Sequence, residues 1–455
     1  DYSATVVDPT DSSRFWTFQE RVTATDTWGV QITSMQINHQ DAVSGTTLGD
    51  GIDVNVSNSA QLLDPSSINN NTVSGNTGHG IQVSLNDNGA INNLTIDGNS
   101  STGNGGNGIG FLTSGTPTLG NLSISNSTDI SGNGGNGIQV QINNVAGVPS
   151  ITVDNNTVQN NAGLGITVDG ADTSLNVVSV SGNTIANNTG GDGLNVNLTS
   201  STGIDSVNRV LTSSNTITGN AGDGLAVHLH DFTVTTDVVA NSNTVSTNAG
   251  QGMLLDILNT NMNDVVASFN TVQGNTGGPG MSVLLNNTTG GPIVADQIVM
   301  NVNSISNNAG DGLDVQLNNI SNVTEVTVRN TQSTGNAGAG YVLSTSGSDI
   351  NTVTVANGNF SNNTGGDGLQ FNLATTSIQT LAVDSDGINT NSGNGLNLNL
   401  DASAVQNLLI TNNSQGSGVN IGLTFLESGN TFPFGGGQGA WSITNSSDPG
   451  VDITS

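Results

Sequence analysis

The chain has no cysteine and no lysine, and only 3% of its 455 residues are aromatic. Without cysteine no disulfide can stabilise the fold, so stability must come from packing and hydrogen bonding. No run of about 18 apolar residues occurs, so no membrane-spanning helix is expected. Helical periodicity is also missing, and the abundant glycine, asparagine and β-branched residues disfavour helix. We therefore expect an all-β chain.

Positive charge is scarce, because four arginines face 34 acidic residues and the net charge is −30. Nothing in the sequence can neutralise phosphates, which excludes nucleic acid and anionic membrane surfaces as partners. Divalent cations or salt would relieve the self-repulsion of such a chain. Because the chain starts at Asp1 and is rich in Asn, Ser and Thr, we expect a processed, extracellular protein. Sequons such as Asn93-Leu94-Thr95 would accept glycans there, although this composition also produces them by chance.

One tripeptide, Gly-x-Gly, recurs fourteen times in register, most often 28 residues apart. A fixed period of this size is typical of a solenoid. Apolar and polar residues alternate after each tripeptide, as in residues 194–198 (LNVNL), which predicts a strand with one buried face. Two shorter apolar segments follow in each period, so we expect three strands and three corners per turn. The second glycines are Gly51, Gly80, Gly108, Gly137, Gly165, Gly193, Gly224, Gly252, Gly280, Gly312, Gly340, Gly368, Gly395 and Gly418.

Asparagine forms a second regular column. Amides stacked one turn apart can hydrogen-bond along the axis at a spacing of about 4.8 Å, so we predict structural ladders and not ligands. Glycine and asparagine are also the residues that most readily adopt the left-handed conformation that corners require. The column comprises Asn76, Asn104, Asn133, Asn161, Asn188, Asn220, Asn248, Asn275, Asn308, Asn336, Asn363, Asn391 and Asn413. A less complete column precedes it by five residues at Asn71, Asn156, Asn183, Asn215, Asn243, Asn270 and Asn303.

The repeat over residues 48–424 resembles the right-handed parallel β-helix family, whose coils carry asparagine ladders and Asn-x-x-x-Gly-apolar-x-apolar turns. The resemblance implies a single parallel β-helix of about 14 coils, each of about 28 residues. It is specific for the fold and not for the function. Members of the family include pectin-degrading enzymes, phage tailspikes, adhesins and surface-layer proteins.

The two ends lack the repeat and carry most of the aromatic side chains. A solenoid exposes an apolar cross-section and open strand edges at each end, which must be covered. Residues 1–47 and 425–455 are therefore predicted to be terminal segments that either cap one subunit or join neighbouring subunits. Joining would be head-to-tail, and such a contact does not close, so it builds a filament. The candidate assembly residues are Phe15, Trp16, Phe18, Trp28, Phe432, Phe434 and Trp441.

The sequence favours a non-enzymatic role. Lyases among the β-helix proteins use a Lys or Arg base beside calcium, whereas this chain has no lysine, and Arg209 and Arg329 lie on different coils. Glycosidases need two carboxylates about 5–9.5 Å apart. The acids on the polar face of the best-defined strands are scattered over coils that are not adjacent. They are Asp53, Asp169, Asp256 and Asp314.

Histidine supplies two further candidates. Gly78-His79-Gly80 is similar to a pectinase motif, but it is more simply the ordinary Gly-x-Gly slot. His228 and His230 alternate on one predicted strand and should face solvent about 7 Å apart. Together with Asp231 they could hold a metal ion, although such pairs are more often plain surface.

Calcium is the ion that the composition favours. It takes six to eight oxygen ligands from carboxylates, amides and carbonyls, and the corners are rich in all three. The alternative is that these aspartates are only solvated turn residues. No catalytic residue or other cofactor is expected. The candidate calcium ligands are the aspartates in the x position, Asp50, Asp192, Asp223, Asp311 and Asp367.

The sequence thus predicts a structural subunit of an extracellular filament, sheath or surface layer. We expect it to assemble with itself through its terminal segments, with calcium as a candidate stabilising ion. A monomeric adhesin or carbohydrate-binding stalk is the first alternative. A polysaccharide-active β-helix enzyme is the second, and it would need a carboxylate cluster on adjacent coils.

Overall fold

The computed structural model describes residues 43–45 and 49–414, except residues 64, 146 and 204. Outside these ranges it describes the backbone of the terminal strands. These are β1 (Ser3–Val7), β2 (Phe15–Ala24), β3 (Thr27–Ile32), β4 (Gln36–Ile37), β5 (Ala42–Ser44), β44 (Ile421–Phe425), β45 (Trp441–Thr444) and β46 (Val451–Thr454).

The fold is an all-β parallel solenoid of about 13 turns with about 28 residues per turn. One turn consists of β16 (Ile138–Asn143), β17 (Val148–Asp154) and β18 (Thr157–Gln159), and the next turn begins at β19 (Ile166–Ala171). Equivalent strands of successive turns pair in parallel, so the turns build three sheets. No helix occurs in the described residues, and therefore none there is long and apolar enough to cross a membrane. The predicted fold class is confirmed.

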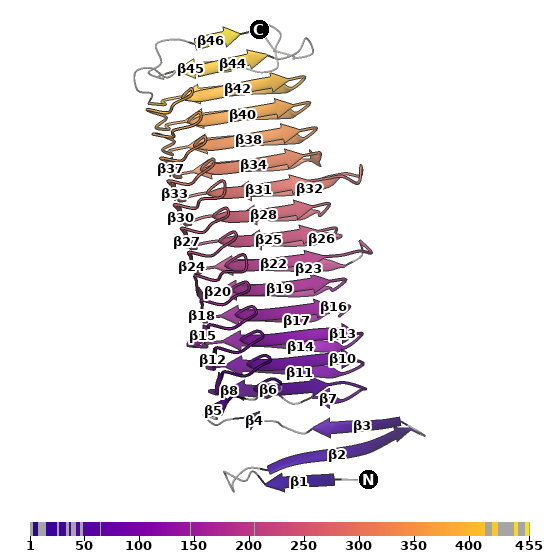
Figure 1. Cartoon of the computed structure of the whole chain (residues 1–455). Coiled ribbons are helices and arrows are strands. Elements are labelled where there is room, and N and C mark those ends of the chain that lie inside the picture. The colour runs from indigo at the N-terminus through magenta and orange to yellow at the C-terminus, as the bar shows by residue number, and fades with distance from the viewer. Residues whose placement is uncertain are drawn as a thin grey trace. The chain divides into compact units, whose positions relative to one another are not determined.

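The chain divides into two compact units. Unit 1 comprises Asp1–Gly191 and Asn195–Leu211, and unit 2 comprises Asp192–Leu194 and Thr212–Ser455. In both units the equivalent strands of successive turns stack in parallel (Figure 1). We call the sheet that follows Gly-x-Gly sheet 1, the next along the chain sheet 2, and the sheet of three-residue strands sheet 3.

Most of the strands of unit 1 fall into these sheets. Sheet 1 contains β6 (Ile52–Val56), β10 (Ile81–Asp87), β13 (Ile109–Gly115), β16, β19 and most of β22 (Leu194–Thr199). Sheet 2 contains β7 (Gln61–Leu62), β8 (Ser66–Asn69), β11 (Ala90–Asp97), β14 (Thr118–Ser125), β17, β20 (Leu175–Ser181) and most of β23 (Ser206–Ser213). Sheet 3 contains β5, β9 (Thr72–Ser74), β12 (Ser100–Thr102), β15 (Asp129–Ser131), β18 and β21 (Thr184–Ala186).

Unit 2 repeats the arrangement. Sheet 1 contains β25 (Leu225–His230), β28 (Met253–Leu258), β31 (Met281–Asn286), β34 (Leu313–Asn318), β38 (Tyr341–Ser346), β40 (Leu369–Ala374), β42 (Leu396–Asp401), β44 and β46. Sheet 2 contains β26 (Val234–Val239), β29 (Met262–Val266), β32 (Ile293–Val299), β35 (Ile320–Ser321), β36 (Val323–Arg329), β39 (Asp349–Ala356), β41 (Ser377–Asp384), β43 (Ala404–Thr411) and β45. Sheet 3 contains β24 (Thr216–Thr218), β27 (Thr244–Ser246), β30 (Thr271–Gln273), β33 (Ser304–Ser306) and β37 (Gln332–Thr334).

Stacking in register places like residues on like residues. Ile138 pairs with Ile166 and Val140 with Val168, and all four side chains are fully buried. The alternate residues of β16 are partly exposed, as the alternation of apolar and polar residues predicts. Each turn therefore contributes apolar columns to a core that runs through the unit, and the solvent-facing residues form columns of their own.

In most of the described repeats the second glycine is required by close approach between turns. A Cβ on Gly137 would lie 2.2 Å from Cγ1 of Val158 and 2.7 Å from the carbonyl oxygen of Gly165. Its backbone is not in the left-handed region. The reason for this glycine is therefore space and not the left-handed conformation that corners require.

The left-handed residue of the corner is the one that precedes the ladder asparagine. Asn160 has φ 56° and Asn307 has φ 56°, whereas Asn161 and Asn308 are not in the left-handed region. The expectation that ladder asparagines themselves supply the left-handed conformation is therefore wrong. Glycine or asparagine fills the preceding position in most turns, because either adopts φ > 0 at low cost.

The terminal strands differ at the two ends. At the N-terminal end β2 pairs antiparallel with both β1 and β3, while β3, β4 and β5 pair in parallel with β7, β8 and β9. At the C-terminal end β45 pairs in parallel with β43, and β46 pairs in parallel with β44. The side chains of residues 1–47 and 425–455 that were predicted to mediate assembly lie outside the described residues.

Candidate functional site

The predicted asparagine column forms a ladder of buried amide hydrogen bonds. Nδ2 of Asn104 donates to Oδ1 of Asn133 across 2.9 Å, and Nδ2 of Asn133 donates to Oδ1 of Asn161 across 2.9 Å. The same bond links the column from Asn76 to Asn188 in unit 1 and from Asn220 to Asn391 in unit 2. The ladder is confirmed. It satisfies polar groups that would otherwise be buried without partners.

The second column is also a ladder, and it accepts residues other than asparagine. The backbone N–H of Ser127 donates to Asn156, that of Asn303 donates to Oγ1 of Thr331, and that of Gly358 donates to Asp386. Sequence reasoning missed these substitutions because it searched for asparagine alone. It also placed Asn413 in the wrong column, because Asn413 Oδ1 accepts the N–H of Asp386 across 2.8 Å.

Asp386 is the most perturbed member of this column. Its Oδ1 accepts the N–H of Gly358, whereas its buried Oδ2 has no hydrogen-bond partner. Burial, with a smaller contribution from the charge of Asp384, raises the pKa of the Asp386 carboxyl to about 7. A carboxyl group is held here in a slot built for a neutral amide.

The aspartates predicted to bind calcium belong to a third ladder. Each occupies the x position of Gly-x-Gly, and its Oδ1 accepts the backbone N–H of the x residue one turn later. Asp50 accepts from His79 across 2.6 Å, Asp192 from Asp223 across 2.7 Å and Asp223 from Gln251 across 2.6 Å. Asp311 accepts from Ala339 across 2.6 Å, and Asp367 accepts from Asn394.

Other residue types fill the same slot with the same contact. His79 Nδ1 accepts the N–H of Asn107 across 2.8 Å, so the histidine of Gly78-His79-Gly80 is a member of this ladder. The ladder stops where it meets a proline. The residue one turn after Gln251 is Pro279, which has no N–H to donate. Gln251 Oε1 instead accepts a hydrogen bond from Ser282 Oγ across 2.6 Å.

These contacts bear on calcium binding. Asp192 and Asp223 lie on successive turns, and each has one carboxylate oxygen engaged by a backbone N–H. Burial raises the pKa of Asp223, to which the charge of Asp192 adds, and burial also raises the pKa of Asp311. The second oxygen of Asp367 also accepts a hydrogen bond, from Asn397 Nδ2 across 2.9 Å. Calcium binding at these corners stays a prediction.

His228, His230 and Asp256 form a compact cluster on sheet 1 of unit 2. Asp256 Oδ2 lies 3.1 Å from Nδ1 of His228 and 3.0 Å from Nε2 of His230. The side chains are between 25% and 28% exposed. Hydrogen bonds from the two imidazoles hold the pKa of Asp256 well below its usual range, and the bond to Asp256 raises the pKa of His230.

The sequence identified the two histidines of this cluster but named the wrong acid. Asp231 turns away at φ 66° and its Oδ1 accepts a hydrogen bond from Asn259 across 2.8 Å. Asp256 is in the cluster because it pairs in register with His228 on the neighbouring strand. The signal was present, since His228 and Asp256 are separated by 28 residues, which is the repeat length.

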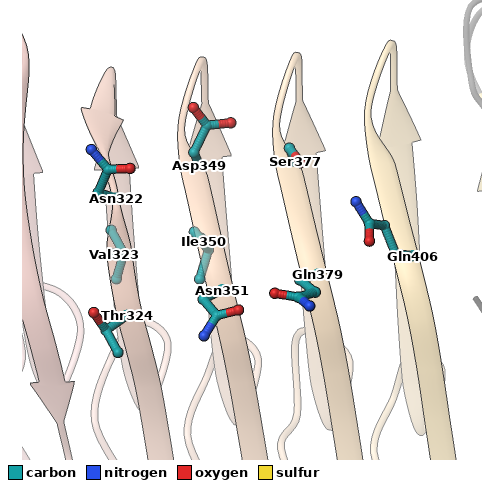
Figure 2. A pocket seen from close by; sticks show the side chains of 9 residues that line it. All are labelled: Asn322, Val323, Thr324, Asp349, Ile350, Asn351, Ser377, Gln379 and Gln406. Atoms are coloured by element: carbon teal, nitrogen blue, oxygen red, sulfur yellow. The ribbon is translucent and has the colours of Figure 1, made fainter.

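A shallow groove of about 570 Å³ crosses four turns of sheet 2 in unit 2. Figure 2 shows its side chains on successive strands, with amide and carboxylate groups predominating. No aromatic side chain lines it, whereas small-molecule pockets are usually apolar and aromatic. The lining residues are Asn322, Val323, Thr324, Asp349, Ile350, Asn351, Ser377, Gln379 and Gln406.

The acids weighed for an enzymatic role occupy separate positions. Asp53 lies on β6, Asp169 on β19, Asp256 on β28 and Asp314 on β34. Asp169 Oδ2 accepts a hydrogen bond from Thr167 across 3.0 Å, and Asp314 Oδ2 accepts one from Gln316 across 2.8 Å. Burial raises the pKa of both carboxyls. The Thr167 and Gln316 contacts are local to one strand, whereas Asp169 also accepts a hydrogen bond from Asn197 on β22.

The comparison with known families agrees with the stacked parallel strands. Residues 119–296 match the family model described as the right-handed β-helix region. Together with the three parallel sheets, this match defines the class of the protein as a parallel β-helix. A search of curated proteins finds no match to the chain. The function must therefore be argued from the residues themselves.

Proposed function

We infer that the protein is a structural, non-enzymatic subunit of an extracellular filament, sheath or surface layer. The observation that carries this proposal is the strand edge at the C-terminal end of sheet 1. β46 pairs in parallel with β44, and no strand among the described residues pairs with its other edge. An unpaired edge is a template for a strand of another chain.

The lateral surface supports the same role. Amide side chains occupy the solvent-facing positions of β40 and β42, as at Gln370, Asn372, Asn397 and Asn399. Neighbouring turns link these amides to one another, as Asn399 Nδ2 donates to Asn372 Oδ1 across 2.7 Å. Such faces are hydrated, and a net charge of −30 adds repulsion between lateral surfaces. Association is thereby directed to the ends, where a heterologous contact generates a filament.

Electron microscopy of the purified chain tests this proposal. Regular filaments are expected. Their loss in EGTA would indicate that the filaments need calcium. Thr454→Lys places a charge on the edge strand β46 and is expected to shorten or abolish filaments. Asn372→Lys places the same charge on β40, a strand paired on both edges, and should leave the filaments intact. Monodisperse particles under all conditions would contradict the proposal.

The groove on sheet 2 favours a second candidate, a monomeric adhesin or carbohydrate-binding stalk. Its amides and the Asp349 carboxylate offer hydrogen-bonding groups across several turns. This role predicts a monomer that binds glycans, and a Gln379→Ala variant that binds them more weakly. A glycan array probed with the full chain separates it from the filament role.

A further inference from the structure

The cluster of His228, His230 and Asp256 interrupts an otherwise amide-rich face. On the strand β25, residues two apart point to the same face of the sheet, so His228 and His230 both face outward. Parallel pairing of β25 with β28 places Asp256 opposite His228. Two imidazoles and one carboxylate thus meet on two adjacent strands, and each is held by regular backbone.

The donor atoms converge on one point. Nδ1 of His228, Nε2 of His230 and a carboxylate oxygen of Asp256 all lie within 4.8 Å of one another. The two rings are nearly perpendicular, with an interplanar angle of 83° and centroids 5.9 Å apart. Among the residues that the structure describes, this is the group of three His, Asp, Glu or Cys side chains whose donor atoms converge in this way.

The two nitrogen–oxygen separations are close to those of a tetrahedral metal site. Zinc binds imidazole nitrogen and carboxylate oxygen at about 2.0–2.2 Å, which places neighbouring ligand atoms about 3.3 Å apart. The two nitrogen–oxygen separations are 3.1 and 3.0 Å. Small side-chain rotations would admit the ion, with no movement of the strands.

The surroundings differ from the rest of the face. Asp256 pairs in register with Leu284 on its other side, and Leu254 and Leu258 flank it on its own strand. Asp223 interacts electrostatically with His228, and Asp231 interacts with His230. The neighbouring leucines lower the local dielectric constant, which strengthens the attraction of these carboxylates for a cation.

We propose that His228, His230 and Asp256 form a three-ligand binding site for a divalent transition-metal ion of the zinc type. Two imidazoles and one carboxylate suit Zn²⁺, Cu²⁺, Ni²⁺ or Fe²⁺, whereas calcium prefers oxygen ligands alone. The ligands come from one face of one sheet, so the remaining coordination positions are open to solvent. Water, or a donor group from another molecule, completes the coordination.

Isothermal titration with Zn²⁺ on the EDTA-treated full chain tests the site. One zinc ion per chain is expected to bind, and Co²⁺ is expected to give the absorption spectrum of a four-coordinate site. His228→Ala, His230→Ala and Asp256→Asn are each expected to weaken zinc binding at least about 10-fold, because even residues behind the ligands contribute that much. Ca²⁺ should not compete.

Two variants serve as controls. Asp314→Asn removes a carboxylate from the solvent-facing side of β34, another strand of sheet 1. His79→Gln removes a histidine from the x position of a Gly-x-Gly tripeptide. Both should bind zinc as the unaltered chain does. Equal thermal unfolding midpoints in EDTA for the parent chain and Asp256→Asn would show that loss of binding is not loss of folding.

The inference is overturned if the parent chain binds no zinc, or if Asp256→Asn and His230→Ala bind it as tightly as the parent. In that event the three residues are a surface hydrogen-bonded cluster alone. The site does not rest on the filament role. Filaments could form without zinc binding, and zinc could bind to a chain that never polymerises.

Discussion

Oδ1 of Asn133 accepts two hydrogen bonds from Asn104 in the adjacent turn, one from the backbone N–H across 3.0 Å and one from Nδ2 across 2.9 Å. Asn133 in turn donates its own N–H and Nδ2 to Asn161. One amide therefore serves two turn-to-turn contacts. Its loss leaves several buried polar groups without partners, which is costly.

Asn133→Ala should accordingly lower the free energy of unfolding by about 2–4 kcal/mol, since each orphaned buried group costs about 1–3 kcal/mol. Asn121 is the matched control, because its Nδ2 also bonds an asparagine one turn away, Asn93, but at an exposed position. Asn121→Ala should change the free energy of unfolding by no more than about 0.5 kcal/mol. Urea unfolding of both variants measures the difference, and equal losses would refute the assignment of the ladder to stability.

The second glycine of the repeat gives a steric prediction. A Cβ at Gly137 would lie 2.2 Å from Val158 Cγ1 and 2.7 Å from the Gly165 carbonyl, which is backbone and cannot rotate away. Gly137→Ala should therefore destabilise the protein by about 3 kcal/mol, as overpacking of a tight core does. A Cβ at Gly291 would meet nothing closer than 4.0 Å, so Gly291→Ala should be close to neutral. Thermal unfolding of the two variants measures the difference. A tolerated Gly137→Ala would mean that the turns separate more easily than their contacts indicate.

The fold was predictable because its signal repeats. The interval between Gly80 and Gly108 is the interval between stacked residues, so Ile81 pairs with Ile109. An apolar column in the sequence is then an apolar column in space. Parallel in-register stacking turns a one-dimensional period into three-dimensional contacts, which is seldom true of other folds.

The candidate site was only half predictable for a related reason. His228 and His230 share a strand, so local alternation was enough to place them together. Asp256 lies on another turn, and finding it required the pairing register and not the local pattern. Asp386 was missed because it is chemically unlike the asparagines whose position it occupies, although Asn413 follows it by 27 residues, close to the repeat length.

Val302 stores strain that a substitution can release. It occupies the left-handed position before Asn303 with φ 59° and is 41% exposed. A β-branched residue is disfavoured there by about 1–2 kcal/mol, and the equivalent residue before Asn156 is Asn155, with φ 56°.

Val302→Asn should therefore raise the free energy of unfolding by about 1 kcal/mol. Val294→Asn makes the same change on strand β32, where the backbone is extended, and should give no gain. A destabilised Val302→Asn variant would show that the exposed valine makes contacts worth more than its strain.

Asp386 makes the stability of the protein depend on pH. Its carboxyl has a pKa of about 7 in the folded chain and an ordinary value of 3.8 when unfolded. Between these values the folded chain keeps a proton that the unfolded chain releases. The contribution of Asp386 is therefore present in full below about pH 4 and is lost as pH rises to about 7. The loss amounts to about 4 kcal/mol at most, at about 1.4 kcal/mol per pKa unit.

Asp386→Asn restores the amide that the ladder accommodates elsewhere and removes this proton. In the equivalent position Asn413 Nδ2 donates to the Val383 carbonyl across 3.0 Å, a bond that an ionised Asp386 cannot make. The stability advantage of Asp386→Asn over the parent should grow from pH 4 to pH 7 and then stay constant.

Asp172→Asn is the matched control, because hydrogen bonds from the backbone N–H and hydroxyl of Ser201 lower the pKa of Asp172, and Asp172 is not among the groups that shift the pKa of Asp386. A lowered pKa contributes stability above the unfolded value, so loss of Asp172 should give no advantage that grows with pH. Chemical unfolding of the three proteins at several pH values decides the matter. An advantage of Asp386→Asn that is the same at pH 4 and pH 8 would mean that the buried carboxyl does not titrate in this range, and that its second oxygen is not isolated from solvent.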